Sequence, residues 1–175
     1  MPSGLAGDAL VLPPERMPDV FAIIRRLRTR AGLRPFLTNN LGYMSWDDPI
    51  LRSAPGVAPR CWLGCFAGVR TVGVASDGSV RGCLALPYEM REGNVRDEAL
   101  KSIWRDPARF AYTRAFTLTD LTGACAACEH GAVCRGGCNA LAMRVHGKTG
   151  TCTHCMAQHE DAARAPVDAP GPASA

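Results

Sequence analysis

The sequence CAACEHGAVCRGGC, residues 125–138, places four cysteines in one short stretch, separated by two, five and three residues. A two-residue gap allows one tight turn to direct two thiolates at the same metal site. Small residues between the cysteines allow backbone amides to approach the sulfur atoms and donate hydrogen bonds to them; these residues are Ala126, Ala127, Gly136 and Gly137. The stretch therefore predicts a metal centre with the thiolate ligands Cys125, Cys128, Cys134 and Cys138.

The rest of the chain is poor in residues that build a large core. Of its 175 residues, 18 are glycine and 13 are proline, and only 6% are aromatic. This composition predicts many turns and irregular segments, so the nine cysteines are the obvious candidates for holding the fold together. Outside the dense run they are Cys61, Cys65, Cys83, Cys152 and Cys155.

The redox compartment decides whether such cysteines form disulfides or bind metal. The N-terminus MPSGLAGDALVLPPER lacks the basic start and apolar run of a signal peptide. The sequence also lacks the stretch of about 18 apolar residues that a membrane span requires. We therefore expect a cytoplasmic protein that does not cross a membrane, with reduced thiols that bind metal.

The thiolates of the dense run suit either an iron–sulfur cluster or a tetrahedral zinc ion, and their spacing alone favours neither. The other cysteines change the balance, because Cys65, Cys83 and Cys155 add three further ligands and make two metal sites the simplest count. Histidines are not needed as ligands in this count. We expect all four to be solvent-facing polar residues: His130, His146, His154 and His159.

Local patterns in the first half predict an α+β fold that is rich in loops. Apolar residues at helical spacing predict a helix over residues 14–30, and residues 35–38 (PFLT) predict a short strand. One helix and one strand cannot bury the strand on both faces, so this unit needs neighbouring elements. Residues 44–60 resemble a connecting loop. Two β-prone runs, residues 69–76 and 79–83, flank Asp77-Gly78 and predict a β-hairpin that ends at Cys83.

Two short helices are expected over residues 97–104 and 106–116. Their buried side is expected to consist of Leu100, Ile103, Trp104 and Phe110. The last dozen residues are of low complexity and are expected to be disordered. The basic run Arg25, Arg26, Arg28 and Arg30 has no interleaved aromatic residues, so it predicts a solvated helix face rather than a nucleic-acid surface.

Cys65-x12-Gly78-x4-Cys83, the dense run and Cys155 together form a seven-cysteine pattern. The pattern resembles the signature of the SPASM domain, a C-terminal extension of radical SAM enzymes, many of which modify peptides or proteins. Residues 10–46 also resemble the last helix and strand of the radical SAM partial barrel. The resemblance implies a barrel remnant at residues 1–46 and a loop-rich iron–sulfur domain at 61–160. Local composition predicts a linker at 47–60 between them and a disordered tail at 161–175.

The resemblance also implies how two auxiliary [4Fe–4S] clusters would be held. The first would be bound by Cys65, Cys83 and Cys138, and the second by Cys125, Cys128, Cys134 and Cys155. Two positions stay open. Cys61 is a possible fourth ligand of the first cluster, and Cys152 competes with Cys155 in the second, with Cys155 favoured by its distance from Cys138 along the chain.

Radical SAM enzymes bind S-adenosylmethionine at a cluster held by a Cys-x3-Cys-x2-Cys motif, and this sequence contains no such motif. We therefore expect the chain to be inactive alone and to use S-adenosylmethionine only through a missing or separately encoded core. The expected role is electron transfer and docking of a peptide or protein substrate. The alternatives are a structural zinc-binding interaction module and a free-standing iron–sulfur electron carrier.

Overall fold

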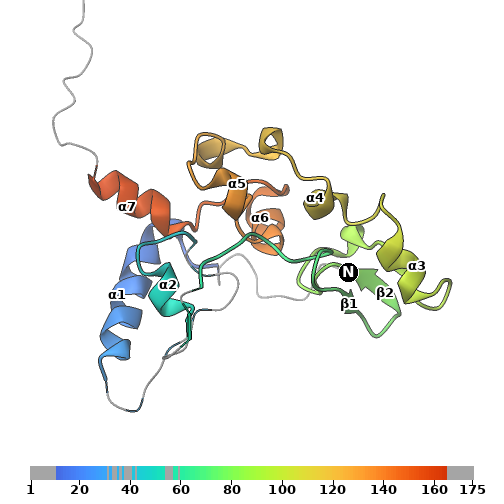
Figure 1. Ribbon diagram of the computed structural model, residues 1–175, viewed down its shortest axis with the longest axis horizontal. Coiled ribbons are helices and arrows are strands. Elements are labelled where there is room, and N and C mark those ends of the chain that lie inside the picture. The colour runs from blue at the N-terminus through green and yellow to red at the C-terminus, as the bar shows by residue number, and fades with distance from the viewer. Residues whose placement is uncertain are drawn as a thin grey trace, which may run out of the picture.

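The computed structural model describes residues 11–30, 32, 35, 37, 41, 43–53, 57–58 and 60–164. It is a mixed structure of short helices and one small antiparallel sheet joined by many loops, which confirms the predicted fold class at this level. The helices α1 (Met17–Arg28), α2 (Asp48–Leu51) and α7 (Met156–Arg164) lie at one end of the molecule. The sheet and α3 (Leu100–Arg105) lie at the other end (Figure 1).

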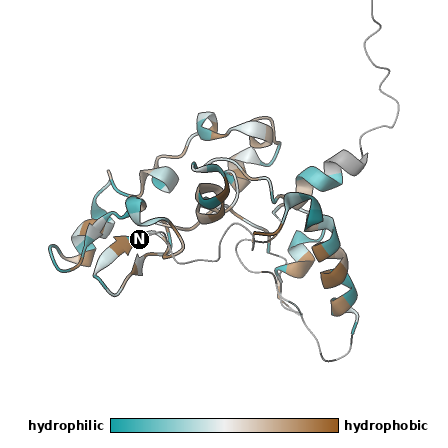
Figure 2. Ribbon diagram, turned by 180° about the vertical axis from the view of Figure 1, so that it is seen from behind, coloured by the Kyte–Doolittle hydropathy of each residue, from teal (hydrophilic) through white to brown (hydrophobic). Residues whose placement is uncertain are grey.

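Among the described residues, the apolar side chains form three small clusters and not one large core. Figure 2 shows hydrophobic residues in short separate stretches, as expected for a chain with few aromatic residues. The central cluster is the one that contains cysteines: it joins Tyr43, Trp62 and Leu121 to Cys125, Cys134, Cys152 and Cys155. The cysteines that were predicted to hold the fold together through a metal centre therefore lie in the central apolar cluster.

The N-terminal cluster buries one face of α1, which follows the 3-10 turn η2 (Pro14–Arg16). Met17, Phe21 and Ile24 lie on this face and pack against Leu37, Leu51 and Met156. The predicted helix over residues 14–30 is confirmed, and its apolar face is covered by α2 and α7. The basic run is only partly a solvated face, because Arg25 forms ion pairs with Asp47 and with Glu160 of α7.

The strand expected at residues 35–38 is not found where the structure describes this segment. Pro35 and Leu37 are not in a strand, and Phe36 and Thr38 lie outside the described residues. Leu37 is buried, and its amide donates a hydrogen bond to the Leu51 carbonyl at 3.1 Å. Residues 44–60 are also not all loop, since they contain α2.

The predicted hairpin is confirmed, with shorter strands than expected: β1 (Gly73–Val74) pairs antiparallel with β2 (Ser79–Arg81), with Val74 opposite Val80. Gly78 takes a φ of 84° in the connecting turn, a left-handed conformation that glycine adopts readily. A third strand, β3 (Gly93–Asn94), pairs with β2 and was not predicted. Glycine and asparagine are uncommon in strands, so neither residue gives a β signal.

The third apolar cluster joins the sheet to α3 and α4 (Ala111–Arg114) through Val80, Ile103 and Phe110, all fully buried. The prediction for Ile103 and Phe110 is confirmed and that for Trp104 holds in part, because its ring packs against the cluster while still partly exposed. The prediction for Leu100 is wrong: it is 37% exposed at the start of α3. Both helices are shorter than predicted.

The remaining helices are short, and several of them carry cysteines. They are η3 (Tyr88–Met90), η4 (Leu118–Asp120), η5 (Gly123–Cys125), α5 (Gly131–Cys134) and α6 (Asn139–His146). In the described part of the chain, no helix is long and apolar enough to span a membrane. The predicted tail at 161–175 begins within α7, which continues to Arg164, and residues 165–175 lie outside the described residues.

Candidate metal centre

Short helices and tight turns position the four cysteines of the dense run. Cys125 ends η5, Cys134 ends α5, and Cys138 immediately precedes α6. Hydrogen bonds hold the turns between them: the Cys128 amide donates to the Cys125 carbonyl at 3.3 Å, and the Gly137 amide to the Cys134 carbonyl at 3.2 Å. The run is thus a series of turns whose ends carry the thiols.

The two glycines before Cys138 are required by close packing as well as by conformation. Arg135, Gly136 and Gly137 all have positive φ, so the chain reverses sharply between Cys134 and Cys138. A Cβ at Gly136 would lie 2.7 Å from Gly150 Cα, and one at Gly137 would lie 2.8 Å from Tyr43 Cε2. This reversal separates the thiol of Cys138 from those of the three cysteines before it.

The first of two cysteine groups, here called the buried group, consists of Cys125, Cys128, Cys134, Cys152 and Cys155. All five line one pocket, together with Met44, His130, Gly131, Gly136 and Gln158. Every member except the half-buried Cys128 is at most 8% exposed. The dense run and the C-terminal loop therefore meet at one site.

Burial and mutual repulsion raise the pKa values of the thiols in the buried group. Burial raises the pKa of Cys134 to about 12, with further increases from Cys155, Cys125 and Cys128. Burial also raises the pKa of Cys155 to about 11 and raises those of Cys152 and Cys125. Since a metal binds the thiolate, loading this site releases protons.

Backbone amides face these sulfur atoms, and one of them belongs to Gly137, a small residue of the dense run. The amide of Gly137 faces Cys134, that of Cys152 faces Cys125, and those of Gln158 and Ala157 at the start of α7 face Cys155, each lowering the pKa of its thiol. Amide donors aimed at sulfur stabilise thiolates and metal-bound sulfides. The donor set of the buried group therefore fits an iron–sulfur cluster.

The second group, here called the open group, consists of Cys65, Cys83 and Cys138. Burial raises the pKa of Cys138, and the charges of Cys65 and Cys83 add to the rise, while the amides of Leu141 and Ala140 in the first turn of α6 oppose it. Cys65 and Cys83 are only half-buried. Cys65 lines a pocket with Tyr112, Thr113, Phe116, Arg135 and Asn139.

The structure thus brings Cys138 to the hairpin cysteines and the other three cysteines of the run to the C-terminal loop. It places Cys152 and Cys155 in the same group, so both remain available to the buried site. Cys61 is exposed and lines neither pocket. Within the described residues, no three Cys, His, Asp or Glu side chains converge closely enough to hold a single metal ion.

The expectation that the histidines face solvent is wrong for His154. It is 6% exposed, and its Nε2 donates a hydrogen bond to the Leu12 carbonyl at 2.7 Å. The other three are half-buried, and His130 lines the pocket of the buried group. His154 lies between Cys152 and Cys155, and this position in the sequence was the one signal for its burial.

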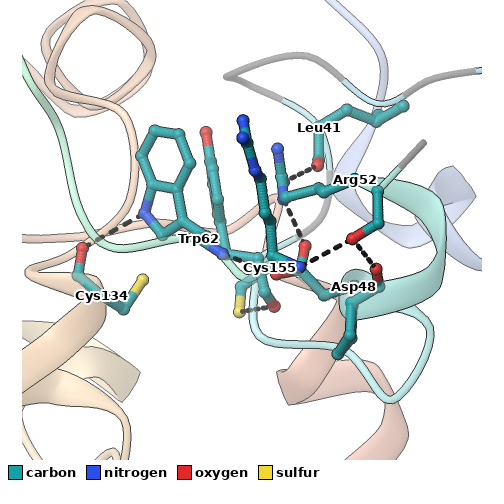
Figure 3. Close-up of polar contacts among 10 residues, drawn as sticks. Leu41, Asp48, Arg52, Trp62, Cys134 and Cys155 are labelled. Atoms are coloured by element: carbon teal, nitrogen blue, oxygen red, sulfur yellow. Dashed lines mark hydrogen bonds and ion pairs between the residues drawn. The ribbon is translucent and has the colours of Figure 1, made fainter. Parts of the chain in front are cut away.

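Sequence reasoning missed a polar network that ties residues 41–62 to the cysteines (Figure 3). Asp48 is 1% exposed, forms an ion pair with Arg52 of the next helical turn and accepts a hydrogen bond from the Trp62 amide at 2.7 Å. Arg52 also donates to the Leu41 carbonyl at 2.7 Å. The four-residue spacing of Asp48 and Arg52, typical of helical ion pairs, was the only sequence signal.

The network reaches the buried group at two points. The Trp62 indole Nε1 donates to the Cys134 carbonyl at 3.4 Å, and the Cys155 thiol donates to the Tyr43 carbonyl at 3.5 Å. The rings of Tyr43 and Trp62 lie 4.8 Å apart between these points. Tyr43, which precedes the predicted iron–sulfur domain, and Trp62 at its start therefore form one wall of its central site.

Comparison with known proteins identifies a family for part of the chain. The model of the SPASM family, an iron-sulfur cluster-binding domain, matches residues 65–129, which include the hairpin, Cys65, Cys83, Cys125 and Cys128. A search of curated proteins finds no match for the chain. The matched segment spans the open group's hairpin and the start of the buried group. Residues 65–129 of this chain are a SPASM iron–sulfur cluster-binding domain.

Proposed function

We propose that this chain binds two [4Fe–4S] clusters that serve as auxiliary clusters in the radical SAM-dependent modification of a peptide or protein. The open group, Cys65, Cys83 and Cys138, holds the first cluster. Cys125, Cys128, Cys134 and Cys155 of the buried group hold the second. The coarser function, auxiliary iron–sulfur cluster binding in radical SAM enzymes, is what the SPASM domain implies.

The observation that supports two clusters is the division of the dense run. Cys138 follows Cys134 by only four residues, yet its electrostatic neighbours are Cys65 and Cys83, whereas those of Cys134 are Cys155, Cys125 and Cys128. A single zinc ion would hold its thiolates about 3.8 Å apart, from a Zn–S distance of about 2.3 Å. A cubane separates its ligands more widely, because each one binds a different iron.

The residues around each group have distinct roles in this proposal. The amides of Gly137, Gln158 and Leu141 hold negative charge on the sulfur atoms, and the buried group excludes water through Tyr43 and Leu121. When bound, the clusters supply one-electron transfer to or from the substrate radical. Cys65 and its pocket lie toward solvent, so we assign substrate docking to the side of the first cluster.

The S-adenosylmethionine chemistry must come from a radical SAM core on another polypeptide or on another part of a longer chain. We propose that residues 1–46 are the last helix and strand of that partial barrel, 47–60 a linker, 61–160 the auxiliary-cluster domain and 161–175 a tail. The hydrogen bond from the Trp62 amide to Asp48 supports a linker that packs against the cluster domain, and the ring contact between Tyr43 and Trp62 supports the same for the barrel remnant.

Anaerobic reconstitution with iron and sulfide tests this function. We expect about eight iron and eight sulfide per chain, brown colour and a Mössbauer spectrum of [4Fe–4S] clusters. Cys155→Ala is expected to lose half of the iron, whereas Cys152→Ala keeps all of it and serves as the matched control from the same pocket. A colourless chain that binds one or two zinc ions would establish the zinc-binding module instead.

A further inference from the structure

The hydroxyl of Tyr43 is an unsatisfied donor in the middle of the protein. Tyr43 is 0% exposed, and its hydroxyl oxygen has no hydrogen-bond partner among the described residues. Buried hydroxyl groups are nearly always paired, because burial removes the hydrogen bonds that water would supply. An orphan of this kind indicates an acceptor that the bare polypeptide does not provide.

The ring of Tyr43 is fixed where the two cysteine groups meet. It packs in one cluster with Cys134, Cys152 and Cys155 and stacks near Trp62. A Cβ at Gly137 would lie 2.8 Å from Tyr43 Cε2 and 3.3 Å from Cys152 Cβ. The ring therefore occupies the space beside the chain reversal that leads directly into Cys138.

Sulfur atoms from both groups lie beside the ring: Cys134, Cys152 and Cys155 belong to its cluster, and Cys138 packs against that cluster. A tyrosine hydroxyl has an ordinary pKa of about 10 and is protonated at neutral pH, so this one is a hydrogen-bond donor. The backbone amide of Cys138 also lies near this oxygen, but not in the geometry of a hydrogen bond.

We propose that the Tyr43 hydroxyl donates a hydrogen bond to the sulfur of Cys138 when a cluster is bound there, and that it thereby raises the reduction potential of that cluster. The inference rests on the proposed function. A neutral thiol is a weak acceptor, whereas an iron-bound thiolate carries negative charge and accepts strongly. Reduction adds one electron to the cluster, so a donor at its sulfur stabilises the reduced form while the proton stays on the tyrosine oxygen.

The test compares Tyr43→Phe with wild type after anaerobic reconstitution, in a potentiometric titration followed by electron paramagnetic resonance. We expect the reduction equilibrium constant of one cluster to fall about tenfold, because the lost hydrogen bond is stronger to the more negative reduced cluster than to the oxidised one. This corresponds to a potential about 59 mV more negative for one electron. Tyr88→Phe is the matched control, because Tyr88 is 46% exposed and lies outside both groups, and it should leave both potentials unchanged.

A second arm identifies the cluster concerned. Cys125→Ala combined with Cys128→Ala should leave only the cluster of the open group, and adding Tyr43→Phe should still lower its potential. If the shift disappears in this background, the acceptor is not Cys138 and the inference is wrong. A chain that binds no iron at all would instead refute the proposed function, so the two failures are distinguishable.

A third arm separates tuning of the cluster from a structural role. Because the hydroxyl has no partner in the cluster-free chain, Tyr43→Phe should unfold there at the same denaturant concentration as wild type or a higher one. If Tyr43→Phe does not load clusters, 3-fluorotyrosine in a Tyr112→Phe chain provides the measurement, since it labels only Tyr43 and Tyr88. Its more acidic hydroxyl should raise the potential, and unchanged potentials would overturn the inference.

Discussion

The two cysteine groups differ in how the chain assembles them. In the open group, Cys65 and Cys83 flank the hairpin, whose strands are close in sequence. Only Cys138 comes from a distant segment. The buried group joins the dense run to the C-terminal loop, and Tyr43 and Trp62, which are distant in sequence, form one wall of it. Burial of the second group removes water from its thiols, whereas Cys65 and Cys83 remain half-buried. The stability of the whole chain should therefore depend more on the buried group.

Removal of one ligand from each group tests this difference and has the largest expected effect. Cys134→Ala and Cys65→Ala should each lower the iron content from about eight to about four per chain. Cys134→Ala should also lower the thermal unfolding temperature much further, because the cluster then no longer joins the dense run to the C-terminal loop. Iron analysis and calorimetry of both variants provide the measurement. Equal unfolding temperatures of the two variants would show that the two groups contribute equally to the stability of the chain.

The buried ion pair beside the second group gives the next largest effect. Asp48→Asn leaves the guanidinium of Arg52 buried without its partner carboxylate and should lower the free energy of unfolding by about 3–5 kcal/mol. Denaturant unfolding of the cluster-free chain measures this change. Asp19→Asn removes the partner of Arg16 in an exposed pair and is the control, with an expected change of about 0–1 kcal/mol. Similar losses in both variants would contradict the assigned role of the network.

The rate of iron loss compares the two cysteine groups within the wild-type protein. A chelator should remove iron from the reconstituted protein in two phases, the faster one from the open group, because its thiols are reached by solvent. Absorbance and Mössbauer spectra recorded during chelation distinguish the phases, and Cys65→Ala should abolish the fast one. A single phase in the wild-type chain would show that burial does not control access.

The smallest effect is expected at Cys61. This residue is exposed and lies outside both pockets, so Cys61→Ala should change neither the iron content nor the two reduction potentials. Iron analysis and a redox titration of the variant check this. Loss of about four iron atoms would identify Cys61 as the fourth ligand of the first cluster.

Several local features were predictable because their causes lie within a few residues. Asp77-Gly78 between β-prone runs predicted the hairpin, since only the turn and its two strands are involved. The spacing of Phe21 and Ile24 predicted the first helix in the same way. The strand at residues 35–38 was not found at its described residues, because Leu37 bonds to Leu51 rather than to a neighbouring strand. β3 was missed because β2, and not its own residues, holds it in place.

The sequence by itself pointed to the SPASM domain, whose family model matches residues 65–129, and to cysteines as candidate ligands, because the spacing of the cysteines and the residues between them are local properties. Only the tertiary structure decided that Tyr43, Asp48 and His154 are buried, and that Asp48 and Trp62 form a polar network beside the buried group. Those outcomes depend on which distant segments exclude water from one another. Burial of this kind is a property of packed surfaces, and no run of adjacent residues encodes it alone.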